Sequence, residues 1–239
     1  MTSKAPVGNR TAPSSVFLVI LGRLLSGSWV LRTMLLRMLD REQSREQSCA
    51  GFLLAGGKSS RMGADKAFLN FDGRTLLDRA LSVMDTVCDR VMIGGNPTKF
   101  AEYKSRTVIA DIFPGCGPLG GIHSALVNSD AELNLMLAVD MPYVTAKLLS
   151  FIFAAAARHA MVVTVPRVSE GLQPLCAIYR REFAVAAERA LRGGNYKIDA
   201  LFSEVSTHVI QEGELATAGF SKRHFFNVNT PQDRVAGER

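Results

Sequence analysis

Cysteine is scarce in this chain, and its four cysteines are far apart in the sequence. No two of them form a C-x-x-C pair, so neither a zinc site nor a dithiol redox motif is expected. We expect reduced thiols, as in a cytosolic enzyme. Cys116 lies in a glycine-rich loop, where exposure is expected; the others are Cys49, Cys88 and Cys176.

The start of the chain lacks both acidic residues and a long apolar run. No Asp or Glu precedes Asp40, and the apolar run at residues 16–22 is interrupted by Arg23. A membrane-spanning helix takes about 20 apolar residues, so this run predicts no membrane span. A basic start followed by an apolar stretch also occurs in signal and transit peptides, but no small-x-small cleavage site follows this run.

Residues 1–48 differ from the rest of the chain. They hold seven Lys/Arg and three Asp/Glu, whereas the remaining residues hold 21 and 19. We expect this segment to be a dispensable N-terminal arm or an over-extended start, with the true beginning nearer Met34 or Met38. A single domain is then expected at residues 49–239. Its nearly balanced charge favours one local anion site over a nucleic-acid surface, which needs a broad basic patch.

Length and composition favour one α/β domain. The 239 residues are 47% hydrophobic and 21% charged, as in globular proteins. Short apolar runs alternate with amphipathic segments, which predicts a three-layer, Rossmann-like fold with a mostly parallel sheet and helices on both faces. The expected strands are residues 50–54, 90–93, 107–110, 133–139, 161–165 and 174–179. The expected helices are residues 75–88, 148–159 and 182–191, with a further helix beginning at 122–128.

Residues 53–66 begin as an apolar run, become a glycine-rich turn and end in cations. Gly56 and Gly57 let backbone N–H groups approach phosphate oxygens, and a following helix would add its positive end. Lys58, Arg61 and Lys66 supply positive charge. This combination favours a polyphosphate site over the alternative, a plain β–α turn. It is neither a P-loop, which needs a glycine five residues before Gly57, nor G-x-G-x-x-G, because its glycines are adjacent.

Two aspartates directly follow predicted strands, namely Asp111 and Asp140. The carboxyl ends of parallel strands share one edge of the sheet, so both should lie near the loop that follows Leu54. A carboxylate that faces bound phosphates is a typical Mg²⁺ ligand. Asp140 is therefore expected to hold the metal; the alternative is that it caps a helix beginning near Val144.

A second Gly/Pro-rich stretch occupies residues 111–121. Its preordered backbone and the Asp111 carboxylate suit the recognition of guanine, whose N1–H and N2–H₂ groups are donors. A long structural connection is the alternative. His123, just beyond this stretch, is expected to be a packed or capping histidine rather than a base. Near the C-terminus, Asn227 and Asn229 would share one face of a strand, or else form an ordinary turn and helix cap.

Three motifs together resemble those of the molybdenum cofactor guanylyltransferases, the MobA family of nucleotidyltransferases. They are L-A-G-G-x-S-x-R-M-G-x-D-K from Leu54, P-G-x-G-P-L-x-G from Pro114, and N-V-N-T-P from Asn227. The resemblance extends over about residues 51–234. It implies that GMP is transferred from GTP to molybdenum-bound molybdopterin with release of pyrophosphate, and that Mg²⁺ is the cofactor.

The resemblance also implies roles for individual residues. The implied catalytic residues are Arg61, Lys66 and Asp140, and Asp140 is the implied Mg²⁺ ligand. The implied GTP-binding residues are Leu54, Ala55, Gly56, Gly57, Lys66, Gly94, Asp111 and Asp140. The implied acceptor-binding residues are Gln173, Asn227 and Asn229. Some relatives carry an asparagine at the position of Gly94, so only a backbone contact with GTP is expected there.

Two alternatives remain open from the sequence. One is a cytidylyltransferase that acts on molybdopterin or on a sugar or polyol phosphate. The other is a non-catalytic GTP-binding carrier, against which the presence of Lys66 and Asp140 argues. The expected partners are GTP and molybdopterin, together with other cofactor-assembly proteins and apo-molybdoenzyme chaperones. Neither nucleic acid nor a membrane is expected as a partner, and the expected location is the cytoplasm.

Overall fold

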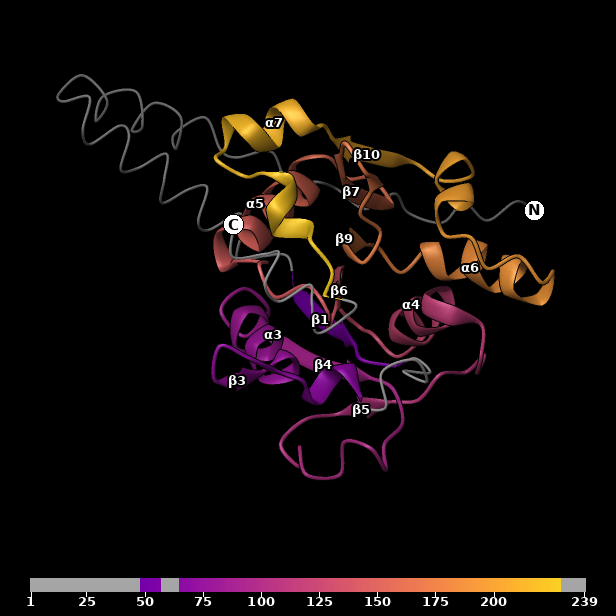
Figure 1. Cartoon of the computed structure of the whole chain (residues 1–239). Coiled ribbons are helices and arrows are strands. Elements are labelled where there is room, and N and C mark those ends of the chain that lie inside the picture. The colour runs from indigo at the N-terminus through magenta and orange to yellow at the C-terminus, as the bar shows by residue number, and fades with distance from the viewer. Residues whose placement is uncertain (1–47, 57–64, 229–239) are drawn as a thin grey trace, which may run out of the picture. The chain divides into compact units, whose positions relative to one another are not determined.

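The computed structural model describes residues 48–56 and 65–228, in which a β-sheet lies between two helical layers (Figure 1). The strands of this sheet are β1 (Cys49–Leu54), β4 (Arg90–Gly94), β5 (Val108–Ile109), β6 (Leu133–Ala138), β7 (Val163–Val168), β8 (Gly171–Leu172), β9 (Cys176–Tyr179) and β10 (Thr207–Ile210). The α-helices are α3 (Leu76–Met84), α4 (Gly117–Val127), α5 (Ala146–Arg158), α6 (Phe183–Arg192) and α7 (Glu212–Thr217).

The order of the strands is β10-β7-β9-β6-β1-β4-β5, and β8 pairs with β7. β1 is parallel to β4 and β6, and β5 is parallel to β4. β9 is antiparallel to both of its neighbours, β6 and β7. The predicted α/β fold is thus confirmed, with a mixed sheet. The connection from β7 to β9 contains only the short β8, whereas parallel neighbours need a crossover of about a dozen residues or more.

The chain reverses its direction across the sheet at β1. It runs from β1 to β4 and β5 on one side, then returns to β6 on the other side. Leu54 at the end of β1 lies opposite Gly94 of β4 and Ala138 of β6, so the three strands end together. In open α/β sheets, ligands bind in the crevice at the carboxyl ends beside such a reversal. The topology therefore places a site beside Leu54.

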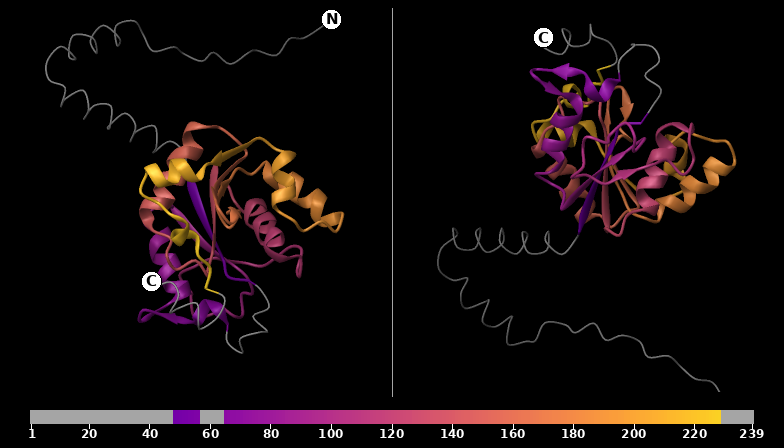
Figure 2. Two further views of the ribbon diagram at one scale, coloured as in Figure 1. Left: turned by 45° about the horizontal axis from the view of Figure 1, so that its top comes forward. Right: turned by 90° about the horizontal axis from the view of Figure 1, so that it is seen from below.

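The helices lie on both faces of the sheet, and each face has its own apolar core (Figure 2). Residues of α3, α5 and α7 contribute to one core, and residues of α4 and α6 contribute to the other. β1 serves both cores: Leu53 belongs to the first and Phe52 to the second, and both side chains are fully buried. Because β1 is covered on both faces, its sequence is a continuous apolar run rather than an alternation of apolar and polar residues.

Local signals in the sequence account for where the helices begin. Thr75 accepts a hydrogen bond from the N–H of Asp78 at the start of α3, and Thr145 does the same for Leu148 in α5. α4 begins at Gly117, five residues before the predicted start, with Pro118 in its first turn. Proline suits that position because its fixed φ is helical and its missing N–H would have no partner there.

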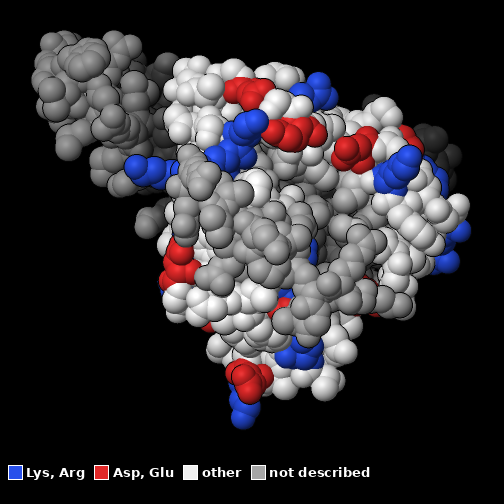
Figure 3. Space-filling model, viewed as in Figure 1, with Lys and Arg blue, Asp and Glu red and all other residues white. Residues whose placement is uncertain are grey.

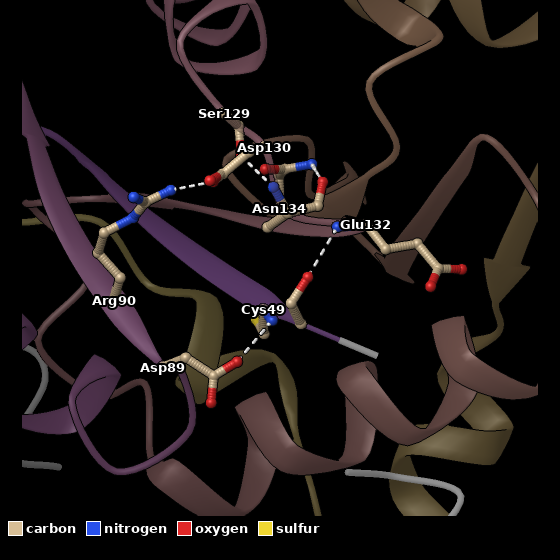
Figure 4. A network of polar contacts seen from close by, with 9 residues as sticks. Cys49, Asp89, Arg90, Ser129, Asp130, Glu132 and Asn134 are labelled. Carbon is tan, nitrogen blue, oxygen red and sulfur yellow. Dashed lines mark hydrogen bonds and ion pairs between the residues drawn. The ribbon is translucent and has the colours of Figure 1, made fainter. Parts of the chain in front are cut away.

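A polar network anchors the amino end of β1, at the edge of the sheet opposite the cavity edge where β1 ends (Figure 4). The N–H of Cys49 donates to the carboxylate of Asp89 at 2.9 Å, and the N–H of Glu132 donates to the Ser48 hydroxyl at 3.3 Å. Asn134, fully buried in β6, donates to the carbonyl oxygen of Tyr179 at 3.1 Å. These contacts fix the strand that leads into the glycine-rich segment.

The smaller elements are a β2–β3 hairpin (Asn70–Phe71 and Arg74–Thr75) and the 3₁₀ helices η1 (Lys66–Phe68), η2 (Asp199–Ser203) and η3 (Lys222–Phe225). No helix among residues 48–56 and 65–228 is long and apolar enough to cross a membrane. Where the described surface is visible in Figure 3, Lys and Arg lie interspersed with Asp and Glu. This distribution agrees with the nearly balanced charge of residues 49–239.

Candidate nucleotide site

A cavity of about 620 Å³ opens at the carboxyl ends of β1, β4 and β6. Its floor comes from the ends of these strands, one wall from the loop that leads into α4, and another from the start of η1. The residues that line it are Leu54, Ala55, Gly56, Asp65, Lys66, Gly94, Asp111, Gly115, Gly117, Pro118, Gly121, Ala138, Val139, Asp140 and Leu175. Segments that are far apart in the sequence thus meet where the topology places a ligand.

Most of the residues implied as GTP-binding lie in this cavity. Leu54, Ala55, Gly56, Lys66, Gly94, Asp111 and Asp140 all line it. Gly57, Arg61 and Asn229 lie outside the described residues, so their roles stay predictions. Asn227 and Gln173 are not among the lining residues.

Lys66 and Asp140 form an ion pair inside the cavity. Nζ of Lys66 lies 3.1 Å from Oδ2 of Asp140, and the side chains are 26% and 21% exposed. Lys66 is the first residue of η1, and Asp65 caps this helix by accepting the N–H of Ala67 at 3.0 Å. Asp140 is the second residue after the end of β6, directly after Val139. The pair places one positive and one negative group side by side, where a polyphosphate and its cation would both be received.

Asp140 does not cap the helix that follows it. α5 begins at Ala146 with Thr145 as its cap, so the capping alternative for Asp140 is excluded. Its carboxylate instead faces the cavity. No cluster of three His, Cys, Asp or Glu side chains suited to a metal occurs among the described residues. Mg²⁺ is commonly held by one or two carboxylates, with substrate phosphates and water completing its shell. The single carboxylate of Asp140, at the carboxyl end of β6, fits that donor set.

The loop before α4 brings Asp111 to the opposite side of the cavity. Its carboxylate accepts no hydrogen bond from the described part of the chain, and burial raises its pKa. The loop is braced from behind, because the N–H of Ile112 donates to the Ser124 hydroxyl at 2.8 Å and that hydroxyl donates to the Gly120 carbonyl oxygen at 2.8 Å. A fixed carboxylate with open acceptor positions can accept the paired N–H donors of a guanine base.

Glycine is required where this loop meets its neighbours. A Cβ on Gly120 would lie 2.8 Å from the carbonyl oxygen of Phe113, and one on Gly121 would lie 3.2 Å from a methyl group of Leu54. Gly115 and Gly117 have φ values of +80° and +66°, which other residues rarely adopt. The glycines of the second motif therefore shape the wall of the cavity.

The C-terminal segment contacts the backbone of one cavity residue, Asp140. The N–H of Val228 donates to the carbonyl oxygen of Asp140 at 2.8 Å. This contact places the exposed Asn227 near Asp140, the expected Mg²⁺ ligand. Gln173 lies in the connection from β8 to β9, where its amide donates to the carbonyl oxygen of Gly171 at 3.2 Å. It stands two residues before Leu175, which lines the cavity. The acceptor roles of Asn227 and Gln173 stay predictions.

His123 is a packed residue, as expected from the sequence. It is 3% exposed, and its ring meets that of Phe113 edge-on with centroids 5.1 Å apart. Neither ring nitrogen has a hydrogen-bond partner among the described residues, and burial lowers the pKa of the imidazole. It is neither a cap nor a lining residue of the cavity.

Two polar residues of this site were not predicted from the sequence. Asp65 appeared only as a letter of the first motif, although it lines the cavity and caps η1. Lys99 belongs to none of the motifs, yet its ammonium group contacts both Asp65 and the backbone of Ala55. A usable clue was its position shortly after β4, since polar residues just beyond parallel strands lie at the ligand edge.

Solved structures define the class of protein. The chain is similar to the molybdopterin-guanine dinucleotide biosynthesis protein A of Archaeoglobus fulgidus, with 25% identity, a TM-score of 0.69, and 79% of this chain and 96% of that one covered. It shares its fold with the 2-C-methyl-D-erythritol 4-phosphate cytidylyltransferase of Thermus thermophilus, at 18% identity and a TM-score of 0.58 over 78% and 96% of the two chains. Fold and cavity are those of an α/β nucleotidyltransferase.

Sequence comparison narrows this class to a family. The model of the MobA-like NTP transferase domain matches residues 51–208. A molybdenum cofactor guanylyltransferase of Desulfosudis oleivorans is 34% identical over 190 residues, which are 79% of this chain and 93% of that protein. The chain belongs to the MobA-like NTP transferase family, as its three motifs predicted.

Proposed function

We propose that this protein is a molybdenum cofactor guanylyltransferase, which transfers GMP from GTP to molybdenum-bound molybdopterin. The observation that carries the proposal is the meeting of Lys66 and Asp140, 3.1 Å apart, in a cavity that also receives both described ends of the glycine-rich segment. The match to the guanylyltransferase of Desulfosudis oleivorans covers 93% of that protein. The proposal therefore concerns the complete transfer reaction rather than one part of it.

The reaction is an in-line displacement at the α-phosphorus of GTP. A phosphate oxygen of the acceptor forms the new P–O bond, the bond to the bridging oxygen breaks, and pyrophosphate leaves with both electrons of that bond. An acceptor phosphate is already ionised at neutral pH, so no covalent enzyme intermediate is needed. Catalysis then rests on positioning and on stabilising the negative charge of the leaving group.

The residues of the cavity divide this work. Lys66 and the backbone N–H groups near Gly56 stabilise the β- and γ-phosphates, together with Arg61 as predicted from the sequence. Asp111 accepts hydrogen bonds from the guanine edge. Asp140 would hold Mg²⁺, which supplies charge neutralisation to the phosphate oxygens when bound. Asn227 stands beside Asp140, where it can orient the phosphate of the acceptor.

Charge at this site is balanced for a nucleotide that arrives with its cation. Lys66 pairs with Asp140 at 3.1 Å. The phosphates offer Lys66 a stronger anionic partner, and this frees the carboxylate of Asp140 for the cation. The exchange needs only side-chain rotation, because both backbones are fixed by η1 and by the Val228 hydrogen bond.

Further partners follow from the product. A cofactor finished at this site is passed to an apo-molybdoenzyme, so we expect transient contacts with its chaperone and with other cofactor-assembly proteins. We place the reaction in the cytoplasm, where GTP is available. Residues 1–48 are proposed to be dispensable for transfer.

The test is acceptor-dependent release of pyrophosphate from GTP, CTP or ATP, with Mg²⁺ and molybdenum-loaded molybdopterin. We expect release from GTP, both with the full chain and with residues 49–239. Release from CTP alone would replace guanylyl by cytidylyl transfer. GTP binding without acceptor-dependent release would identify a carrier.

A further inference from the structure

Lys99 contacts both the beginning and the end of the first motif of the nucleotide site. Its ammonium nitrogen lies 2.5 Å from Oδ2 of Asp65 and donates a hydrogen bond to the carbonyl oxygen of Ala55 at 2.8 Å. In the sequence, Ala55 stands just before the glycines of the first motif, and Asp65 stands at its end. One side chain from the β4–β5 connection thus holds both sides of that motif.

The ammonium group of Lys99 is well shielded from water. Its side chain is only 20% exposed, and its nitrogen lies 4.6 Å from the ring centroid of Phe100 and 5.9 Å from that of Phe68. Aromatic faces attract cations, and ion pairs gain strength as they lose contact with water. The contact with Asp65 therefore differs from an exposed surface pair, which contributes little.

The backbone that carries Lys99 is a tight turn fixed at both ends. The side chain of Asn96 accepts the N–H of Thr98 at 2.9 Å, and the carbonyl oxygen of Asn96 accepts the N–H of Lys99 at 3.1 Å. Phe100 is 1% exposed and packs so closely on Gly95 that a Cβ there would lie 2.9 Å from the ring. Lys99 therefore extends from a rigid base and can fix the position of its partners.

Its partner Asp65 leads directly to the catalytic pair. One carboxylate oxygen of Asp65 accepts the N–H of Ala67 and so caps η1, while the other contacts Lys99. Lys66 is the first residue of η1, and its ammonium group reaches Asp140. A shift of Asp65 would move the start of η1, and with it the lysine that meets the phosphates.

Asp65 also brings an unfavourable charge to the site. It lines the cavity together with Lys66, and its side chain is 33% exposed. A carboxylate at this place repels a triphosphate unless a cation neutralises it. Lys99 supplies that cation without being a lining residue itself.

We propose that Lys99 is a positioning residue for nucleotide binding. By bridging Ala55 and Asp65 it sets the place from which Lys66 reaches the phosphates, and it neutralises Asp65 beside them. The inference rests on the proposed function only for the class of ligand, a nucleoside triphosphate with its divalent cation.

The first test replaces Lys99 by methionine, which keeps an apolar stem on the two rings and removes the ammonium group. Calorimetry on the full chain should show that the dissociation constant for GTP with Mg²⁺ rises about tenfold, as expected for one charged hydrogen bond. KM for the acceptor should stay unchanged. Lys104→Met is the matched control, because Lys104 is exposed in the same connection and its loss removes the same charge; its GTP affinity should equal that of the wild type.

A double-mutant cycle tests the bridge itself. Asp65→Asn keeps a residue that caps helices well but removes the charge that Lys99 contacts. In that background Lys99→Met should weaken GTP binding by no more than about twofold, because both residues act through one contact. Equal losses in the two backgrounds would overturn the proposal. A lower Tm for Lys99→Met with unchanged GTP affinity would also overturn it, since that result belongs to a purely structural lysine.

These outcomes separate the inference from the proposed function. If the wild type binds and uses CTP instead of GTP, the same constants are measured with CTP, and their rise in Lys99→Met would still support the bridge. Intact guanylyl transfer with no change in Lys99→Met refutes the inference alone. A wild-type chain that binds no nucleoside triphosphate would refute both.

Discussion

Lys66 and Asp140 are 74 residues apart in the sequence, yet Nζ of one lies 3.1 Å from Oδ2 of the other. The sheet brings them together, because β1 and β6 are adjacent parallel strands that end side by side. The ion pair places a cation and a carboxylate side by side in the cavity. Three predictions follow from it and from the walls of the cavity, and a fourth concerns two histidines outside the cavity.

Asp140→Asn should abolish most of the transfer activity. Asparagine keeps the backbone carbonyl that accepts the N–H of Val228, so the fold is retained, but it removes the charge that would hold Mg²⁺. We expect kcat to fall at least about 100-fold, the usual cost of losing one preorganised electrostatic group. Initial rates at several Mg²⁺ concentrations check this.

Asp130→Asn is the matched control, because Asp130 stands before the opposite end of β6 and its side chain is 82% exposed. Its rate should equal that of the wild type. Wild-type turnover in Asp140→Asn would remove Asp140 from the reaction.

Asp111→Asn should weaken the preference for guanine. The amide would place donor hydrogens where guanine also presents donors, so we expect the ratio of kcat/KM for GTP to that for ATP to fall about tenfold or more. Asp199→Asn is a suitable control, since burial raises the pKa of that carboxyl as well but Asp199 lies outside the cavity. An unchanged ratio in Asp111→Asn would show that the base is read elsewhere.

Gly120→Ala should damage the wall of the cavity. The added methyl group would lie 2.8 Å from the carbonyl oxygen of Phe113, and the loop before α4 must shift to relieve the contact. We expect a loss of stability of about 1–3 kcal/mol, as for other overpacked sites, and a raised KM for GTP. Denaturant unfolding and steady-state kinetics measure the two effects.

Gly213→Ala is the control for Gly120→Ala, because Gly213 lies in α7 and a Cβ there meets no atom of the described residues within 4 Å. It should leave KM unchanged and stabilise the protein slightly, since alanine favours a helix. If both variants behaved alike, the close approach at Gly120 would have no consequence for the site.

The stability of the protein should fall as the pH decreases below about 6.5, the ordinary pKa of histidine. Burial lowers the pKa of both His123 and His208 in the folded state. The unfolded chain therefore binds protons first, and the stability present above the ordinary pKa is lost as the pH falls towards the lowered values. The carboxyl groups of Asp111 and Asp199 have the opposite effect on stability at lower pH. Burial raises their pKa, so the folded state binds their protons before the unfolded chain does as the pH falls.

His123→Leu isolates one part of this pH dependence. Within the described part of the chain, both ring nitrogens of His123 lack hydrogen-bond partners, so leucine should leave stability at pH 7.5 within about 1 kcal/mol of the wild type or raise it. The loss of stability between pH 7 and pH 5.5 should become smaller, as followed by urea unfolding. An equally steep loss in His123→Leu would mean that His123 does not titrate in this range.

Much of the fold could be predicted because its signals are local. The buried run at β6 and the helical spacing of α3 and α5 are visible in short windows of sequence. The direction of β9 could not be predicted in this way, because it depends on how a short connection folds back beside β6. The start of α4 was placed too late because its first turn consists of Gly117, Pro118 and Leu119, which look like a loop.

The site could be predicted where a residue follows a strand or belongs to a motif. Asp111 and Asp140 satisfied the first condition and Lys66 the second, and all three line one cavity. Lys99 belongs to no motif and stands five residues beyond the end of β4. Its contact with Asp65 exists only because the turn after β4 lies beside η1 in space, and periodicity in the sequence carries no information about such a contact.

The most direct test of the central claim follows the phosphates of GTP. Full-length protein is incubated with Mg²⁺, molybdenum-loaded molybdopterin, and GTP radiolabelled on either its α- or its γ-phosphate. Nucleotidyl transfer predicts that the α-label appears in the dinucleotide product and the γ-label in pyrophosphate, only when acceptor is present. Transfer of the γ-label to the acceptor, or release of the γ-label without acceptor and no dinucleotide, would contradict the account.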